Sequence, residues 1–532
     1  MINTWWATRP KRDLRGVAPI LSVVATHAEG RKWKQPGKAT ELAIEEGLED
    51  AGLKRRGARR DKGGGGARTY RAWLKSLGLI FMDSDDRMWT TLAGDAILQG
   101  EPPLPVMKKV VLATQFPSAF TAKGLSAVDP RFRVRPFVFL LQLLADDRLG
   151  GYLSEAEDIA KIVICFAESN EQRYVGDVVE RILRHRRDGD NSLPTDYLER
   201  FRPPRSKSTS LEPVFANFRD IANTFGNQIS FTQLVTVKPG GRWEITPGAE
   251  AEVTAVITEM TKQPLIRDAS DEEKFQRRFG LPPGKSKDTR NLDQTARNIT
   301  AATIAEQKIT TAFLALSSQR IITQITSDLV EEIAETTGER AHTVDRVLAR
   351  KFPAGGIDTF MTEYAVMAFA SRDRATEFEK ATAAIFSEVF GFTVKHMGQE
   401  GIRPDVVISS QQEQFAAIID AKAYKGSYSA THDHRNRMIK YVDTYSQYKI
   451  DGNPLEFFSY VVSEYKPTIT GQIEEIHRET GTPGSAITAR DIIRMVERTK
   501  SKPYTHRELR RIFSTNKGLS FSDIGVERTG PV

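Results

Sequence analysis

The chain has 532 residues, of which 39 % are hydrophobic and 27 % charged, and its formal net charge is +7. A chain of this length is too long to fold around one ordinary hydrophobic core. Its composition is typical of globular domains and excludes a fibrous or wholly disordered chain. The sequence contains no apolar run of about 18 residues, so no membrane span is predicted. The first residues lack a secretory-signal pattern, and the single cysteine excludes an internal disulfide. We therefore expect several domains and a cytoplasmic location.

Positive charge is concentrated in residues 1–75, which contain 17 Lys and Arg against 8 Asp and Glu. A basic patch this local predicts contact with a polyanion, because neutralising phosphates drives nucleic-acid affinity. A solvated basic arm is the alternative. The predicted DNA-binding residues of this segment are Arg9, Lys11, Arg12, Arg31, Lys34, Arg55, Arg56, Arg59, Arg60, Arg68 and Arg71.

The order of predicted elements after the glycine loop at residues 63–66 is typical of a winged helix. We expect a helix at 69–77, a strand at 78–81, a polar turn at 83–86, a strand at 87–90 and then a helix. In such modules a helix can enter the major groove while the hairpin touches the DNA backbone, although some serve only as protein contacts.

The same order of elements is predicted a second time between residues 214 and 257. It consists of a helix at 215–225, a strand at 228–235, a turn, a strand at 242–246 and a final helix. Apolar periodicity predicts helices at 134–144 and 153–168 between the two copies. Residues 268–292 are polar and predict an interdomain linker, and residues 293–350 predict a helical spacer.

The clearest catalytic pattern lies between residues 374 and 462. Asp405 precedes an apolar run at 406–408, and Asp420 ends a second run at 415–419 after a polar turn. Two such runs predict paired strands, which would bring both acids to one end of a sheet, with Lys422 on the face of Asp420. These carboxylates could hold Mg²⁺ while the lysine orients a water nucleophile. Solvated strand ends are the alternative, since an Asp-x-Lys triplet alone is common.

The elements around this pattern are those of the PD-(D/E)xK nuclease core. They are a helix at 374–390, a strand at 393–396, the two paired strands, a further helix and a strand at 457–462. The motifs F-G-F at 390–392, R-P-D at 403–405, I-D-A-K-A-Y at 419–424 and F-F-S-Y-V-V at 457–462 resemble the cleavage domain of the type IIS restriction endonuclease FokI. This resemblance implies that Ala421 supplies a third, carbonyl ligand. Glu379 would add an outer carboxylate, unless it is an exposed helix acid.

The helix predicted after the second strand bears on self-association. Its apolar stripe must face the core, while Asn436 and Lys440 lie one turn apart on another face. In FokI-like enzymes this face is the dimer contact, and an acid and an arginine pair across it. Asn436 and Lys440 lack that pairing, which implies weak transient homodimerisation, a second subunit, or nicking of one strand. His432 and His434 begin this helix, and we expect both to be solvated.

The front half resembles the recognition region of AlwI-type restriction and nicking endonucleases. The motifs are W-W at 5–6, W-K at 33–34, L-G-L-I at 77–80, Q-F-P-S at 115–118 and R-P-F-V at 135–138. Such enzymes read short asymmetric sites in double-stranded DNA and cut to one side. The resemblance also implies a prokaryotic source and a cognate DNA methyltransferase as a genetic partner.

Together these patterns predict a multidomain fold: a mainly α-helical N-terminal recognition region with winged-helix-like modules and a C-terminal α/β PD-(D/E)xK domain with a mixed central sheet. The expected parts are a basic recognition subdomain at 1–112, a second subdomain at 113–265, the linker and spacer at 266–354 and the cleavage domain at 355–532. The predicted function is a Mg²⁺-dependent type IIS-like restriction endonuclease. The alternatives are a strand-specific nicking enzyme, a nuclease acting on RNA or branched DNA, and a winged-helix DNA-binding regulator with an inactive nuclease-like domain.

Overall fold

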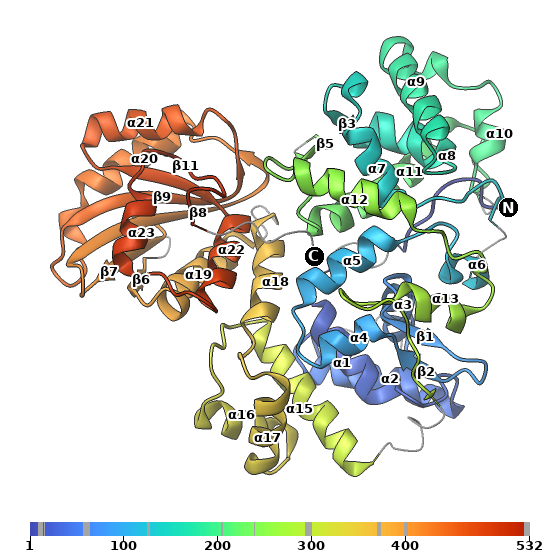
Figure 1. Cartoon of the computed structure of the whole chain (residues 1–532), viewed down its shortest axis with the longest axis horizontal. Helices are drawn as coiled ribbons and strands as arrows, with labels where there is room; N and C mark the ends of the chain where they lie inside the picture. Colours follow the sequence, from blue (N-terminus) through green and yellow to red (C-terminus); the bar gives the residue numbers. More distant parts are fainter. Residues whose placement is uncertain are drawn as a thin grey trace. The chain divides into compact units, whose positions relative to one another are not determined.

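The computed structural model describes residues 1–8, 14, 16–56, 64–124, 128–203, 206–238, 240–292, 300–369, 374–397 and 403–525 (Figure 1). The chain forms two compact units. Unit 1 comprises Met1–Ser318 and Gln324–Thr359, and unit 2 comprises Gln319–Thr323 and Phe360–Gly530. Among the helices in these described ranges, none is long and apolar enough to cross a membrane.

Unit 1 begins with the helix, strand, turn, strand and helix order predicted from the sequence. Its elements are α1 (Val17–Ala28), α2 (Ala39–Asp50), α3 (Gly65–Ser76), β1 (Ile80–Met82), β2 (Met88–Thr90) and α4 (Leu92–Leu98). The two strands pair in antiparallel fashion, with Phe81 opposite Trp89. Trp33, Trp73 and Trp89 are fully buried in this part of the chain, and Trp89 packs with Phe81 and Leu292. A winged-helix-like arrangement therefore forms around an aromatic core.

The middle of unit 1 contains a second helical layer around a three-stranded sheet with the order β3-β5-β4. Its elements are α5 (Pro103–Ala113), α6 (Ala119–Gly124), α7 (Pro136–Leu144), β3 (Tyr152–Ser154), the π-helix η3 (Glu155–Val163), α8 (Ile164–Phe166), α9 (Gln172–Asp188), η4 (Gly189–Ser192), α10 (Tyr197–Phe201), α11 (Leu211–Phe231), β4 (Val235–Lys238), β5 (Arg242–Ile245) and α12 (Glu250–Lys262).

One prediction for this layer is wrong, and another is confirmed only in part. The strand expected at 228–235 is largely the last turn of α11, because Ile229 and Phe231 continue the buried stripe of that helix. The helix expected at 153–168 is confirmed from Glu155 to Phe166, as a π-helix followed by one α-turn, but its first two residues belong to strand β3. Leu153 pairs with Trp243 of β5, so long-range strand pairing overrides the local helical pattern.

Residues 268–292, predicted as an interdomain linker, are packed into unit 1. They contain α13 (Glu272–Phe279), whose first residue is buried. Glu272 accepts hydrogen bonds from the backbone N–H of Met82 and from Lys75 Nζ, each at 2.7 Å. Polar composition misled the prediction here, because this carboxylate is satisfied by partners almost 200 residues away in the chain. The boundaries at 112, 265 and 354 stay predictions.

The helices expected as a spacer also contact the first layer of unit 1. They are α15 (Ala301–Ser317), α16 (Ser327–Thr337) and α17 (Ala341–Lys351). The hydroxyls of Ser22 in α1 and Thr311 in α15 lie 2.7 Å apart. Ile309 and Phe313 of α15 are buried, so this helix supplies core to unit 1.

Unit 2 is a six-stranded mixed sheet with the order β11-β10-β9-β8-β7-β6. Its strands are β6 (Thr393–His396), β7 (Val406–Ser410), β8 (Phe415–Tyr428), β9 (Leu455–Tyr465), β10 (Gly484–Thr488) and β11 (Lys517–Gly518). The pairs β6–β7 and β7–β8 are antiparallel, whereas β8, β9, β10 and β11 run parallel. The predicted C-terminal α/β domain with a mixed sheet is confirmed.

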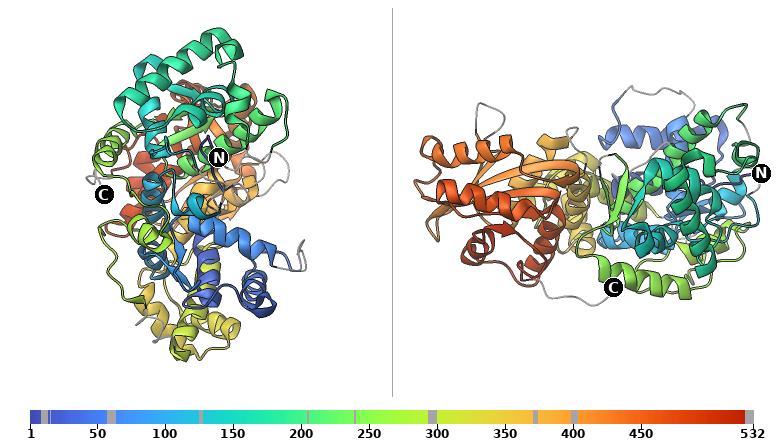
Figure 2. Two further views of the ribbon diagram at one scale, coloured as in Figure 1. Left: turned by 90° about the vertical axis from the view of Figure 1, so that its right-hand side faces the viewer. Right: turned by 90° about the horizontal axis from the view of Figure 1, so that it is seen from above.

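Two layers of helices cover this sheet (Figures 1 and 2). The helices of unit 2 are α18 (Ile357–Ala368, which begins in unit 1), α19 (Ala375–Ala384), the π-helix η6 (Ile385–Val389), α20 (His432–Asp443), η7 (Tyr445–Gln447), α21 (Ile469–Thr480), α22 (Ala489–Thr499) and α23 (His506–Phe513). Ile418 and Phe458 pack with residues of α20 and α21. Phe457, which points the other way, stacks on Phe513 of α23 at 5.6 Å.

Candidate active site

The pairing of β7 with β8 places the two candidate acids at one end of the sheet. Val406 lies opposite Ile419, so Asp405, just before β7's first residue, and Asp420, just after Ile419, are neighbours. Ile418, two residues before Asp420, belongs to the core beneath α20 and α21. Because side chains alternate along a strand, Asp420 and Lys422 lie on the α20 side of the sheet.

The lysine joins the two acids. Lys422 Nζ lies 2.9 Å from Asp420 Oδ1 and 3.2 Å from Asp405 Oδ2. The backbone N–H of Ala421 also donates to Asp405 Oδ2, at 2.9 Å. Only 16 % of the Asp405 side chain and 4 % of the Asp420 side chain are exposed. The structure thus brings the predicted catalytic residues together in a largely desolvated cluster.

Burial and mutual repulsion dominate the electrostatics of the cluster. Burial, and then the charge of Asp420, raise the pKa of Asp405 to about 8, although Lys422 acts to lower it. Burial alone would lower the pKa of Lys422, but the charges and hydrogen bonds of Asp420 and Asp405 outweigh it and raise that pKa. The ammonium therefore stays charged, while the carboxyl pair tends to hold a proton.

The donor set fits a divalent ion. Two carboxyl groups lie close enough to repel each other, and carboxylate oxygens are the ligands that Mg²⁺ prefers. A cation at this point would replace the proton and relieve the repulsion. Asp405 and Asp420 are the residues that could hold such an ion. The carbonyl-ligand role of Ala421 stays a prediction.

Glu379 faces this cluster rather than solvent. Its side chain lies on α19 and is largely buried, with 11 % exposed. Burial raises the pKa of Glu379, and the charges of Lys422 and Asp420 both act on it, the first lowering and the second raising that pKa. Its Oε2 also lies 4.0 Å from His396 Nε2 on β6. The exposed-acid alternative is therefore wrong, while the outer-carboxylate role stays a prediction.

One residue near the cluster was missed by the sequence analysis. His432 is exposed as expected, but His434 is half-buried and stacks on Tyr428 at the end of β8. The ring centroids lie 5.5 Å apart and the planes are 14° from parallel. The only sequence signal was a His-x-His pair at a helix start, which does not reveal which histidine turns inwards.

The predicted dimer-contact residues are both exposed on α20. Asn436 Nδ2 and His432 Nδ1 lie 3.2 Å apart within the first turns of this helix. Lys440 follows one turn later. Whether this face pairs with a second chain stays a prediction.

The predicted DNA-binding residues fall into two groups. Arg9, Lys11, Arg12, Arg59 and Arg60 lie outside the described residues. The others are on the surface of unit 1: Arg31, Lys34, Arg55 and Arg56 are exposed, and Arg68 and Arg71 on α3 are half-buried.

Two local contacts refine this basic surface. The Arg71 guanidinium lies 4.6 Å from the centre of the Trp33 ring, a cation–π contact that holds its position. Arg56 pairs with Asp50 at 2.8 Å. The hairpin tip between β1 and β2 is acidic, since Asp83, Asp85 and Asp86 outnumber Arg87.

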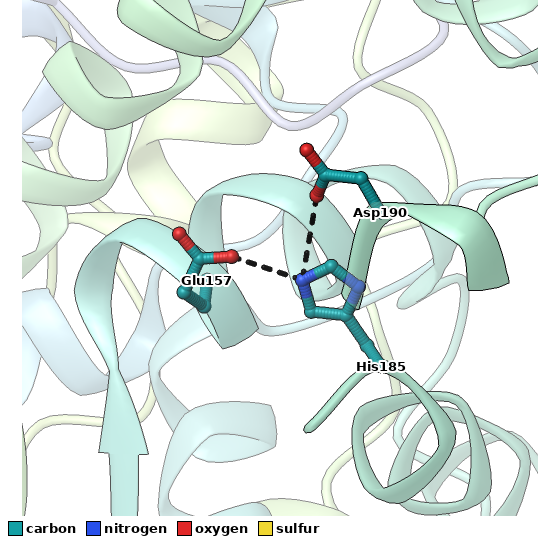
Figure 3. Close-up of side chains that lie close together, drawn as sticks. All are labelled: Glu157, His185 and Asp190. Atoms are coloured by element: carbon teal, nitrogen blue, oxygen red, sulfur yellow. Dashed lines mark hydrogen bonds and ion pairs between the residues drawn. The ribbon is translucent and has the colours of Figure 1, made fainter. Parts of the chain in front are cut away.

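A second group of acidic and histidine side chains lies in unit 1 (Figure 3). Within the described ranges, Glu157, His185 and Asp190 are close enough to hold a metal ion. His185 Nε2 lies 3.0 Å from Glu157 Oε2 and 3.8 Å from Asp190 Oδ1. Lys161 Nζ, however, already contacts both carboxylates, at 2.8 and 2.7 Å. This group is best explained as an ion-pair network that joins η3, α9 and η4.

Comparison with known proteins bears mainly on unit 2. Residues 338–520 match the family model described as FokI, cleavage domain, and this range includes Asp405, Asp420 and Lys422. The type II restriction enzyme StsI of Streptococcus sanguinis is 23 % identical over 147 residues, which are 26 % of this chain and 24 % of StsI. The chain therefore matches only about a quarter of the length of that relative.

Solved structures with similarity to the chain include two of the restriction endonuclease FokI. The first gives 14 % identity over 98 % of this chain and 100 % of FokI, with a TM-score of 0.29. FokI bound to DNA gives 16 % identity over 94 % and 89 %, with a TM-score of 0.31. The binding domain of the BpuJ1 endonuclease, in complex with modified DNA, gives 14 % identity over 53 % and 95 %, with a TM-score of 0.37.

Proposed function

Because residues 338–520 match the family model of the FokI cleavage domain, we propose that this chain is a type IIS-like restriction endonuclease. It binds a short asymmetric site in double-stranded DNA and hydrolyses phosphodiester bonds at a distance from that site. The observation that carries the proposal is the cluster of Asp405, Asp420 and Lys422 within this matched segment. A DNA-binding protein without activity would have no need to bury this cluster of charges.

The side chains of the cluster have separate roles in this proposal. Asp405 and Asp420 hold the divalent ion, which when bound polarises the phosphate and supplies a hydrated, activated nucleophile. Lys422 orients the attacking water and stabilises negative charge that develops on the phosphate, because its ammonium is fixed by two hydrogen bonds. Glu379, on α19, orients the side chains of the Asp405, Asp420 and Lys422 cluster.

The N-terminal part of unit 1 is proposed to bind the DNA. Arg68 and Arg71 lie on the third helix of the winged-helix-like layer, the position that enters the major groove in such modules. The acidic hairpin tip is unsuited to contact with phosphates, so α3 and the neighbouring basic residues are preferred over the hairpin. A cognate DNA methyltransferase and a prokaryotic cytoplasm complete the proposal.

A strand-specific nicking enzyme is the second candidate. The exposed residues Asn436 and Lys440 stand on α20 where FokI-like enzymes are expected to pair an acid and an arginine between subunits. Without that pairing, homodimers would form only transiently or a second subunit would be needed. One cleavage domain acting alone would cut one strand.

Digestion of a defined supercoiled plasmid with the full-length chain and Mg²⁺, followed by sequencing of the ends, tests both candidates. Linear product with ends at a fixed offset from one sequence supports the restriction enzyme, and open-circular product supports the nicking enzyme. Asp420→Ala and Lys422→Ala should each abolish cleavage and retain site-specific binding. Cleavage by either variant at the wild-type rate would overturn the assignment of the active site.

A further inference from the structure

Tyr424 stands beside the catalytic cluster, on the face of β8 that carries Lys422. Ile418 and Tyr428 belong to the core that packs with α20 and α21, so this face of β8 is turned towards α20. The ring centroids of Tyr424 and Tyr428 lie 5.5 Å apart, which places Tyr424 on the same side of the sheet. Alternate residues of a strand are about 7 Å apart, so Tyr424 is the next side chain after Lys422 on this face.

The backbone at Tyr424 departs from regular strand pairing. Lys422 pairs with Val462 and Ser427 pairs with Glu464, so β8 advances by five residues while β9 advances by two. Extra residues of this kind form a bulge, and bulges beside active sites re-aim side chains. At this bulge, 38 % of Tyr424 is exposed. The strand therefore presents an aromatic residue to solvent just after the lysine of the cluster.

The side chain of Tyr424 combines a braced ring with an unused donor. Tyr428, which contacts the ring, in turn stacks on His434 and lies 5.4 Å from the ring of Tyr460. In the part of the chain that the structure describes, no residue forms a hydrogen bond with the Tyr424 hydroxyl. This O–H group can therefore donate to a ligand without giving up an existing partner.

DNA supplies acceptors for such a donor next to the cluster. Lys422 already donates to Asp405 and Asp420, so its ammonium is committed to the phosphate that these groups act on. Tyrosine hydroxyls are among the groups that bind DNA phosphates, and such contacts fix the position of the duplex without reading its bases. An exposed aromatic residue with no ligand is the alternative, since single exposed apolar residues are common.

We propose that Tyr424 is a substrate-positioning residue of the cleavage site, whose hydroxyl donates a hydrogen bond to an oxygen of the phosphate next to the cleaved one on the same strand. This inference rests on the proposed nuclease function. It adds a contact that holds the DNA strand in register with Asp405, Asp420 and Lys422. The acceptor carries negative charge, so the hydrogen bond is of the stronger, charge-assisted kind.

Three single substitutions of the full-length chain separate the hydroxyl from the ring. Tyr424→Phe keeps the ring on Tyr428 and removes only the hydroxyl. Tyr424→Leu removes the ring as well. The matched control is Phe521→Leu, which removes a half-buried ring of unit 2 that contacts Arg494 at 4.8 Å instead of the cluster.

Cleavage of a synthetic duplex is measured under single-turnover conditions with Mg²⁺, at the cut position found by the plasmid digestion. Tyr424→Phe should lower the rate constant at saturating protein by about 10- to 100-fold, the effect of losing one hydrogen bond to a charged group. The half-saturating concentration should stay close to that of the wild type. Tyr424→Leu should cleave no faster than Tyr424→Phe, and Phe521→Leu should cleave like the wild type.

A modified substrate identifies the acceptor. A methylphosphonate, which replaces one charged phosphate oxygen by a methyl group, is placed in turn on either side of the phosphate that is cleaved. At one of these two positions it should slow the wild type about as much as Tyr424→Phe does. At that position it should slow Tyr424→Phe little further, because the same hydrogen bond is already absent.

Two results would overturn the inference while leaving the proposed function intact. One is cleavage by Tyr424→Phe at the wild-type rate. The other is a methylphosphonate effect that is as large in Tyr424→Phe as in the wild type at both positions, which would exclude a contact with either phosphate. If the wild-type chain itself fails to cleave any DNA with Mg²⁺, the proposed function and this inference fall together.

Discussion

Divalent-ion binding at the cleavage site should depend steeply on pH, because Asp405 holds a proton in the metal-free protein. Burial and the Asp420 charge raise the pKa of Asp405 to about 8, far above the usual value of 3.8. A cation binds the ionised carboxylates, so it must displace this proton. Affinity should therefore rise as the pH rises, and it should level off above the raised pKa.

The size of the effect follows from that pKa. With a pKa of about 8, the Asp405 carboxyl group is ionised in roughly 1 % of the molecules at pH 6, roughly 9 % at pH 7 and roughly half at pH 8. The apparent association constant should increase about tenfold between pH 6 and 7, about fivefold from 7 to 8, and less than twofold beyond pH 9. The same proton affects stability with the opposite sign. Because the folded state binds it more tightly than the unfolded state, the free energy of unfolding of the metal-free protein falls as the pH rises from about 4 to 8.

Mn²⁺ is a suitable probe because carboxylate oxygens bind it as they bind Mg²⁺, and free Mn²⁺ is quantified directly by electron paramagnetic resonance. Titrations between pH 6 and 9 should give the predicted rise. Asp405→Asn should bind more weakly and with a nearly flat pH profile, since no carboxyl group remains at position 405 to release a proton. A wild-type profile that is flat over this range would refute the assignment of the proton to this pair.

Three further predictions concern Glu379, the exposed face of α20 and the basic residues of unit 1. Glu379→Gln keeps the size of a buried side chain but removes its charge. This variant should cleave plasmid about tenfold more slowly and bind DNA like the wild type in a gel-shift assay. Equal losses of cleavage and of DNA binding would contradict an orienting role. Asn436→Asp combined with Lys440→Arg supplies an acid and an arginine on α20 and should raise the ratio of linear to open-circular product, which an unchanged ratio would disprove. Arg55→Ala should reduce the slope of log affinity against log salt by about 1. Arg56→Ala should reduce it by less, because Arg56 already has an ion-pair partner; identical slopes in the two variants would argue against a phosphate contact at Arg55.

The position of the acids in the cleavage site could be predicted because it depends on short-range structure. A polar turn of a few residues separates the strands that Asp405 precedes and that Asp420 ends, so antiparallel pairing fixes their proximity. Alternation along β8 then places Lys422 on the same face. Each step uses only local pattern and strand geometry. The proximity of Asp405, Asp420 and Lys422 could therefore be predicted from the sequence.

Two features that sequence reasoning missed depend on contacts that form only in the tertiary structure. Glu272 is one acid among many in a polar segment, yet it is buried and accepts hydrogen bonds from Met82 and Lys75. The inward turn of His434 depends on Tyr428 and Tyr460, whose side chains meet α20 only after the sheet has formed. Periodicity and composition carry no information about such partners, so neither could separate His434 from the exposed His432.

In the proposed nuclease, the charge of the cluster of Asp405, Asp420 and Lys422 gives a physical reason for a cation to bind before the DNA phosphate. Three carboxyl groups, of Glu379, Asp405 and Asp420, surround the single ammonium of Lys422, and burial leaves little water to screen them. With all of these groups ionised the site is negative, and its substrate is a polyanion. Burial is the main cause of the raised pKa values of Glu379 and Asp405, and the charge of Asp420 adds to it at Asp405. One divalent ion cancels the excess, so ion binding and phosphate entry must favour each other.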